Sequence, residues 1–117
     1  MQRIMKKSKI HSATITGLEL YYEGSITIDK IILDKANILP NEQVQIVNLN
    51  NGKRLISYTI AGESNSGVIE LNGPAARLGA IGDKIIIISY GNYNEDEVKN
   101  LKPKVILLNN DNCIISK

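Results

Sequence analysis

The sequence is divided into short segments rich in Ile, Val and Thr, and each segment ends at a cluster of turn-forming residues. These β-branched residues favour the pleated, half-buried surface of a strand. The clearest example is the pair of segments 43–49 and 53–61, which flank Asn50-Asn51-Gly52. Asn-Gly is the strongest short hairpin signal, because both central residues of the turn need positive φ. The chain is therefore predicted to consist mainly of short strands.

Further strands are expected where apolar and polar residues alternate, or where a short apolar run lies between turns. They are the segments 11–16, 25–28, 68–71, 84–90, 104–108 and 113–116. Segment 84–90 is apolar at alternate and intervening positions, which is typical of a strand buried on both faces. Many short strands with turns between them favour a closed β-barrel, since closure removes exposed strand edges.

Helices are expected to be few and short. Asp29 can cap a helix that runs to about Ala36. Asn94 and Glu97 form a capping-box-like start for a second helix, which ends before Pro103. The chain has 117 residues and shows no repeat or linker, so one domain spanning residues 1–117 is predicted.

The composition excludes several common site chemistries. A Cys/His zinc site needs about four ligands, which the single His11 and single Cys113 do not supply, so no metal site is predicted. One cysteine cannot form an internal disulfide, which fits a reducing cytoplasm, and Cys113 is read as a small strand residue. The net charge of +2 is too close to balance to indicate a nucleic-acid partner.

The chain is also expected to be soluble and not exported. Its first ten residues are basic, but no apolar segment of signal-peptide length follows them. Its apolar runs, such as Ile85–Ile88, are far shorter than the roughly 20 residues that span a bilayer. No membrane partner is predicted.

Gly24-Ser25 is the dipeptide at which a side chain can come close enough to the backbone to react with it. Glycine allows a backbone conformation that other residues avoid, and it lets the serine hydroxyl approach the preceding carbonyl. By itself, a Gly-Ser dipeptide usually marks only a turn before a strand. A role for Ser25 therefore depends on what the rest of the chain contains.

Four separate blocks of residues occur together in this chain. They are Lys9-Ile10-His11, the segment Tyr22 to Asp29, the segment Asn51 to Arg54 with Tyr58, and Asn72-Gly73 followed by Ala75-Ala76-Arg77. In these blocks the chain resembles the aspartate 1-decarboxylase family, from its N-terminus to about Lys104. Several ordered blocks at family-like spacing are more specific than any single motif.

The resemblance implies a carboxy-lyase that converts L-aspartate to β-alanine and carbon dioxide for the biosynthesis of pantothenate, a precursor of coenzyme A. It also implies that the proenzyme cleaves itself after Gly24, giving fragments 1–24 and 25–117. In this reading Ser25 becomes a covalent pyruvoyl group, which is the cofactor, and its ketone forms a Schiff base with the substrate amine.

The resemblance further implies roles for individual residues. Tyr58 would be the proton donor, and Arg54 would grip a substrate carboxylate with its bidentate guanidinium. The other residues implied are Lys9, His11, Tyr22, Asn72, Gly73, Ala75 and Ile86 for substrate binding, and Gly24 and Ser57 for processing. From the residues alone, Arg54 is instead a surface cation, Tyr58 a packed strand residue and Ile86 a core residue. A lone histidine such as His11 is more often structural than catalytic.

The chain departs from the family pattern at two positions. Ser57 stands where family members carry threonine, and Pro74 stands where many relatives have alanine. Proline has no backbone N–H, so the amide of residue 74 cannot donate a hydrogen bond. The speed of processing, and any need for a maturation factor, are left open by the sequence.

The resemblance implies a six-stranded double-psi β-barrel with short helices, assembled as a homotetramer with active sites between subunits. Two alternatives remain open at this stage. The chain could be an inactive proenzyme that stays uncleaved, or a non-catalytic β-barrel binding module such as an oligonucleotide-binding barrel. Such modules stack bases on aromatic side chains, and five Tyr without Phe or Trp fit that role poorly.

Overall fold

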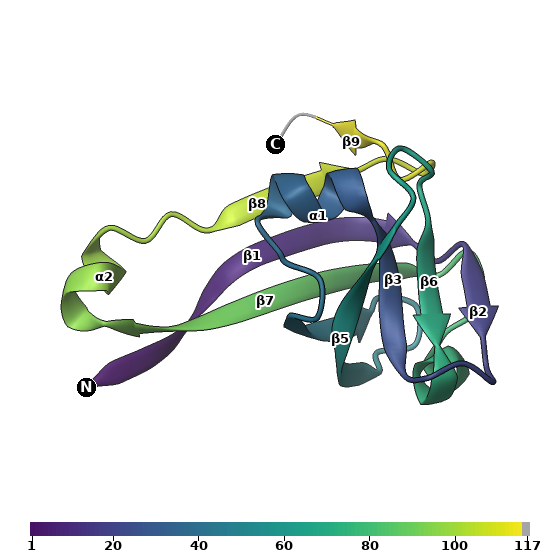
Figure 1. Ribbon diagram of the computed structural model, residues 1–117, viewed down its shortest axis with the longest axis horizontal. Coiled ribbons are helices and arrows are strands. Elements are labelled where there is room, and N and C mark those ends of the chain that lie inside the picture. Colours follow the sequence, from purple (N-terminus) through teal and green to yellow (C-terminus); the bar gives the residue numbers. More distant parts are fainter. Residues whose placement is uncertain (116–117) are drawn as a thin grey trace.

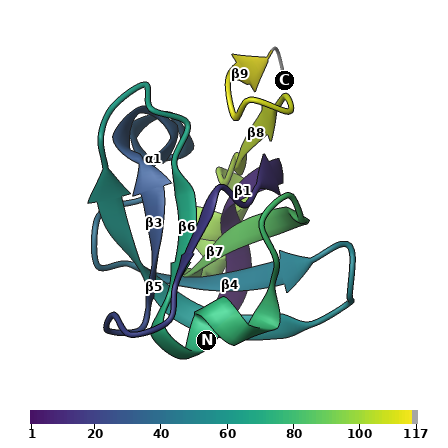
Figure 2. The ribbon, with the colours of Figure 1, turned by 90° about the vertical axis from the view of Figure 1, so that its right-hand side faces the viewer.

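Nine strands are hydrogen-bonded in the order β2-β6-β3-β5-β4-β7-β1-β8-β9 (Figures 1 and 2). The computed structural model describes residues 1–115. The strands are β1 Gln2–Thr14, β2 Gly17–Glu19, β3 Ser25–Asp29, β4 Gln43–Asn48, β5 Arg54–Gly62, β6 Ile69–Asn72, β7 Lys84–Asn94, β8 Lys104–Leu108 and β9 Ile114–Ile115. The helices are α1 Lys30–Ala36, the 3-10 helix η1 Gly73–Leu78 and α2 Glu95–Lys99. The prediction of a mainly β protein is confirmed.

The six strands in the middle of this order, β6 to β1, form the barrel. Its two ends meet just after β1, where Thr16 N donates to the carbonyl of Ile69 at 2.8 Å. The Ile69 amide in turn donates to Thr16 Oγ1 at 3.0 Å. The fold is a double-psi β-barrel with short helices, as predicted, and the short strands β2, β8 and β9 are additions at the ends of the strand order.

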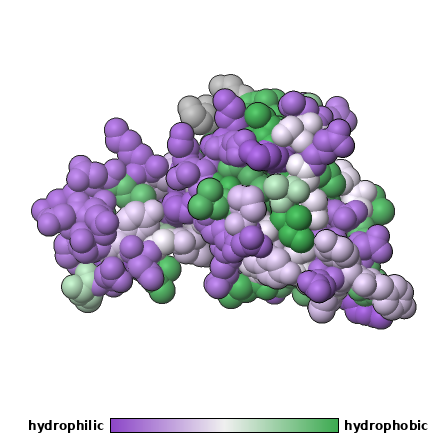
Figure 3. Space-filling model, viewed as in Figure 1, coloured by the Kyte–Doolittle hydropathy of each residue, from purple (hydrophilic) through white to green (hydrophobic). Residues whose placement is uncertain are grey.

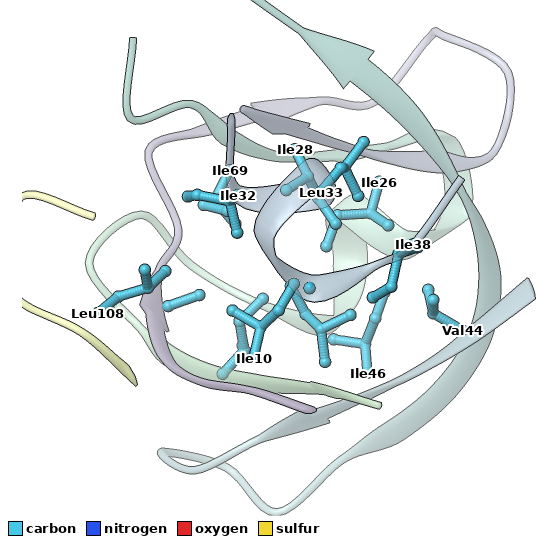
Figure 4. Packing of buried hydrophobic residues seen from close by; sticks show 14 of the residues in the cluster. Ile10, Ile26, Ile28, Ile32, Leu33, Ile38, Val44, Ile46, Ile69 and Leu108 are labelled. Carbon is cyan, nitrogen blue, oxygen red and sulfur yellow. The ribbon is translucent and has the colours of Figure 1, made fainter. Parts of the chain in front are cut away.

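The core consists almost entirely of aliphatic side chains from the inner faces of the strands and from α1 (Figure 4). On β7, Ile85 and Ile87 are completely buried, whereas Ile86 and Ile88 are only half-buried. The expectation that this strand is buried on both faces is therefore wrong. The reason is that β7 lies in the wall of a barrel, so only every second side chain points inward.

Asp29 organises one end of the barrel, as its predicted capping role requires. Its Oδ1 accepts hydrogen bonds from the amides of Ile31 and Asn65, and its Oδ2 accepts one from Gly67, each at 2.9 Å. The carboxylate is nearly inaccessible to solvent, so these bonds offset the cost of burying its charge. One side chain thus starts α1 and also holds the loop between β5 and β6.

The predicted capping box at the second helix is confirmed as well. Asn94 Oδ1 accepts from the Glu97 amide at 2.9 Å, and Glu97 Oε1 accepts from the Asn94 amide at 2.8 Å. Both helices are short, and within residues 1–115 no helix is long and apolar enough to cross a membrane.

The predicted strand boundaries fail most clearly at β1 and β7. β1 begins at Gln2 instead of residue 11, and β7 continues to Asn94 instead of residue 90. The ends of these additions pair with each other, from Gln2 opposite Asn94 to Met5 opposite Gly91, and extend from the barrel as a ribbon that ends at α2 (Figure 1). Backbone pairing stabilises these polar residues as strands, although their side chains show no alternation. The segments β2 and η1 were not predicted, and Ser116 lies outside the described residues.

A partly buried ion pair links the loop between α1 and β4 to the barrel. Lys7 Nζ lies 3.1 Å from Glu42 Oε2, which also accepts a hydrogen bond from Ser89 Oγ. The Leu39 amide donates to Glu42 Oε1 at 3.0 Å. Burial by itself would raise the pKa of Glu42, but the bonds from Ser89 and Leu39 and the Lys7 ammonium outweigh it and hold the pKa below its ordinary value of 4.5.

We expect the Glu42→Gln variant to lose a pH-dependent part of the stability. Because the pKa of Glu42 is lowered in the folded state, its carboxylate stabilises the fold above pH 4.5, and this contribution disappears as the pH falls through the lower, folded value. The free energy of unfolding in urea should therefore be lower for the variant than for wild type at about pH 7, and the difference should be much smaller at about pH 3.

Glu95→Gln is the matched control for this change. Glu95 pairs with Arg3 at 3.1 Å, but both side chains are about half exposed, so the pair is worth little. An equal stability difference at both pH values for Glu42→Gln would contradict the assignment.

Candidate functional site

Ser25 is the first residue of β3 and is completely buried. Its Oγ accepts a hydrogen bond from Asn72 Nδ2 at 2.8 Å and donates a long one to the carbonyl of Glu23 at 3.5 Å. Asn72 ends β6, lies directly opposite Ser25 in the antiparallel register and is only 1% exposed. The strand pairing therefore places a carboxamide donor on the serine hydroxyl.

Gly73 brings the turn after Asn72 into contact with the segment before Ser25. Its φ is +64°, and a Cβ at this position would lie 2.6 Å from the Tyr22 carbonyl and 2.8 Å from the Gly24 amide. Backbone atoms cannot approach a side chain so closely, so only glycine fits. The predicted site residues Tyr22, Gly24 and Gly73 are thus packed together.

Pro74 also lies against Gly24. Its Cδ is 3.6 Å from the position that a Cβ on Gly24 would occupy, which is ordinary van der Waals contact. Pro74 lies in the first turn of η1, where a backbone N–H would have no hydrogen-bond partner within the helix, so its absence in proline costs nothing. The buried Ala75 follows it in the same helix.

Tyr58 lies on the strand beside Ser25. β3 and β5 are parallel, with Ile26 opposite Thr59, and both of these residues are completely buried. Because side chains alternate along a strand, Ser25 and Tyr58 share the opposite, outer face. The Tyr58 side chain is 36% exposed and lines a shallow surface cavity of about 540 Å³.

Tyr22 lines a second surface cavity, of about 450 Å³, together with Thr27, Ile60 and Glu70. The structure thus brings five of the predicted residues around Ser25. They are Tyr22, Gly24, Tyr58, Asn72 and Gly73.

Other predicted residues lie on strands that do not neighbour β3. Lys9 and His11 are on β1, where they pair with Val105 and Leu107 of β8. Ile86 is on β7 and pairs with Val47 of β4. One chain therefore does not gather these side chains at Ser25.

Arg54 is at the start of β5, on the same face as Tyr58 but four residues away. At about 3.3 Å per residue this separates their Cα atoms by about 13 Å. A small substrate at Ser25 is therefore not within easy reach of the Arg54 of the same chain.

Ser57 precedes Tyr58 on β5 and pairs with Val44. Val44 is buried in the core, so Ser57 is on the inner-facing side of the strand, although it also borders the cavity that Tyr58 lines. In the described part of the chain, its hydroxyl makes no hydrogen bond to Gly24 or Ser25. Its role in processing stays a prediction.

Thr27 is the residue at this site to which sequence reasoning assigned no role. Its Oγ1 accepts a hydrogen bond from Asn72 Nδ2 at 2.9 Å. The signal available in the sequence was its spacing of two from Ser25 on a predicted strand, which places both hydroxyls on one face.

The family model described as aspartate decarboxylase matches residues 1–115 of this chain. Three similar curated proteins are each named aspartate 1-decarboxylase. The one from Thermoanaerobacter pseudethanolicus is 56% identical over 112 residues, which cover 96% of each chain. The one from Clostridium beijerinckii is 58% identical over 110 residues, 94% of this chain and 89% of the relative. The one from Kosmotoga olearia is 56% identical over 117 residues and covers both chains fully.

One solved structure is also similar to this fold. It is the crystal structure of a rationally designed protein, which aligns over 68% of this chain and 91% of its own, with a TM-score of 0.48 and 15% identity.

Replacing Gly73 by alanine should destabilise the protein by about 3 kcal/mol, since the change adds left-handed strain to a clash with backbone atoms. Gly52→Ala is the matched control, because Gly52 also has positive φ, at +75°, but no atom lies within 4 Å of its Cβ position. The control should cost only about 1 kcal/mol. Chemical unfolding measures both, and equal losses would show that the packing against Tyr22 and Gly24 is unimportant.

Proposed function

The chain belongs to the aspartate decarboxylase family, and we propose that it is a self-processing, pyruvoyl-dependent carboxy-lyase. It decarboxylates L-aspartate to β-alanine, which supplies pantothenate biosynthesis. The observation that carries the proposal is the buried Ser25 hydroxyl, directly after Gly24 and hydrogen-bonded by the Asn72 carboxamide. The proposed location is the cytoplasm, and the proposed partners do not include nucleic acid or a membrane.

The residues around Ser25 fit a pyruvoyl group made from that serine. The Asn72 side chain reaches residue 25, and its buried Oδ1 is without a hydrogen-bond partner among the described residues. Buried polar atoms are normally paired, so this acceptor is available to a group that forms during maturation. Gly73 leaves room for the backbone of Gly24 to lie directly against it.

Self-cleavage needs only atoms of the chain and one water molecule. Ser25 Oγ attacks the Gly24 carbonyl carbon, and as the C–N bond breaks, the acyl group moves from nitrogen to oxygen and an ester results. Loss of the Ser25 Cα proton then breaks the Cβ–O bond, which releases Gly24 as a carboxylate and leaves dehydroalanine at residue 25. Water hydrolyses its imine tautomer to the ketone and ammonia.

When formed, the pyruvoyl ketone supplies the electron sink that decarboxylation of an amino acid requires. The remaining catalytic tasks are assigned to side chains of the protein. Tyr58 lies on the strand beside residue 25, and its phenol O–H can deliver the proton that replaces the lost carboxylate. Tyr22, Asn72, Gly73 and Ala75 form the wall next to residue 25, with Asn72 as the hydrogen-bonding group.

The substrate carboxylates need cations and hydrogen-bond donors, and we assign these roles to Arg54, Lys9 and His11. Arg54 offers a rigid fork that matches a carboxylate. All three lie on parts of the barrel away from the Ser25 of their own chain. A site that combines them with Ser25 is therefore assigned to the contact between two copies, with Ile86 contributing an apolar wall.

Exposed apolar side chains support such an assembly. Ile4 on the β1 ribbon is 76% exposed and Ile56 on β5 is 66% exposed. Together with Tyr90 they line a surface cavity of about 410 Å³. Figure 3 shows hydrophobic side chains at the surface of the barrel, whereas the end of the ribbon is mostly hydrophilic. A two-stranded ribbon is marginal by itself in water, so packing on a neighbour would stabilise it. The proposed assembly is a homotetramer.

Mass spectrometry of purified protein tests processing and assembly together. Under denaturing conditions, aged wild-type protein should give fragments 1–24 and 25–117, the second with an N-terminal pyruvoyl group, while Ser25→Ala stays whole. Under native conditions both proteins should give a tetramer. Wild type that remains intact after prolonged incubation, and makes no β-alanine from aspartate, would identify an inactive proenzyme. A monomer would contradict the shared site.

Tyr58→Phe separates processing from decarboxylation. Cleavage after Gly24 should proceed, because the phenol is not part of that step. β-Alanine formation should fall by about a hundredfold or more, which is the usual contribution of general acid catalysis. Tyr93→Phe removes a tyrosine hydroxyl from β7, away from Ser25, and should leave the rate unchanged. Equal rates in both variants would remove Tyr58 from the mechanism.

A further inference from the structure

The Asn72 carboxamide is shared between two hydroxyl groups on β3. Its Nδ2 donates to Ser25 Oγ at 2.8 Å and to Thr27 Oγ1 at 2.9 Å. Ser25 and Thr27 are two residues apart on a strand, so both side chains lie on one face, opposite the end of β6. The three polar groups form a short chain of hydrogen bonds that is closed off from solvent at Ser25 and Asn72.

This arrangement uses the full donor capacity of the amide. A carboxamide nitrogen carries two hydrogens, and each has its own hydroxyl acceptor here. Oδ1, in contrast, is buried and has no partner among the described residues. The two hydrogen bonds that Nδ2 donates therefore fix the orientation of the carboxamide plane. One of them goes to the reacting Ser25 and the other to Thr27.

We propose that Thr27 is a positioning residue for self-cleavage: its hydroxyl aligns the Asn72 carboxamide so that the other N–H is directed at Ser25 Oγ. This inference rests on the proposed cleavage after Gly24. A donor aimed at Oγ stabilises the negative charge that develops on the oxygen as its proton leaves. Without the Thr27 acceptor, the amide has one anchored hydrogen bond instead of two and can rotate away from this direction.

The hydrogen bond to Ser25 Oγ belongs to the uncleaved chain. In the proposed cleavage, Oγ leaves residue 25 as an oxygen of the Gly24 carboxylate. Within residues 1–115, Thr27 makes no hydrogen bond to Gly24 or Ser25, so it acts through Asn72. Its effect should therefore appear in the rate at which fresh protein matures.

The test measures the appearance of fragment 25–117 with time, by denaturing mass spectrometry of freshly purified protein. Thr27→Val keeps the size and branching of the side chain but removes the acceptor, and it should slow cleavage by about tenfold or more, as loss of alignment of a reacting group does. Thr27→Ser restores the hydroxyl and should cleave at nearly the wild-type rate. If Thr27→Val does not fold, Thr27→Ala serves in its place.

Thr16→Val is the matched control. Thr16 Oγ1 also hydrogen-bonds, to both backbone groups of Ile69, but lies at the barrel closure away from Ser25. It should cleave at the wild-type rate. Thermal unfolding of Ser25→Ala with and without Thr27→Val, both uncleavable, should be cooperative in both proteins, with the midpoint lowered only by the loss of the one hydrogen bond from Asn72 to Thr27.

The outcomes distinguish this inference from the proposed function. If the wild-type protein does not cleave after Gly24, the proposed function is wrong, and so is the role proposed for Thr27. If wild type cleaves and Thr27→Val cleaves equally fast, only the role of Thr27 is overturned. Equally slow cleavage in Thr27→Val and Thr27→Ser would also overturn it, because the hydroxyl that Thr27→Ser keeps would then not be what sets the rate.

Discussion

The pairing of β3 with both β5 and β6 is the constraint on which the candidate site depends. The antiparallel register with β6 sets Asn72 opposite Ser25, and the parallel register with β5 sets Tyr58 beside it. A shift of one residue in either pairing would turn these side chains to the other face of the sheet. Ile26 and Ile28 oppose such a shift, because both are completely buried in the core. Core packing thus secures the polar geometry on the outer side.

The barrel also limits what one chain can do. Its interior is filled by aliphatic side chains (Figure 4), so the polar groups of the site, even the buried Ser25, lie on the outer side of the strands and not in the core. A convex surface offers shallow cavities, whereas a small charged substrate needs to be enclosed and contacted from several sides. Tyr58 and the buried Ser25 lie on one part of the outer side of the barrel, while Arg54 and Lys9 lie on others. Contact between copies is a direct way for such a barrel to build a pocket.

Much of the fold could be predicted from local signals. Asn50-Asn51-Gly52 marks the β4–β5 hairpin, Asp29 caps α1, and Asn94 with Glu97 starts α2, because each acts within a few residues of the chain. The first half of β1 could not be predicted, since its polar residues become a strand only through pairing with the end of β7. The role of Gly73 could be suspected from a resemblance, but its physical reason, the contact with Tyr22 and Gly24, exists only in the folded chain.

The sequence by itself determined the class of the fold and, through the family resemblance, the residue proposed to react. Alternating β-branched residues require strands, and the ordered blocks around Gly24-Ser25 indicate the family. Tertiary structure alone decided how Asn72, Thr27 and Ser25 meet, although Asn72 and Ser25 are 47 positions apart. Alternation in a sequence says which side chains share a face, but hydrogen bonds form at about 3 Å, and that distance depends on strand register, which the whole core sets.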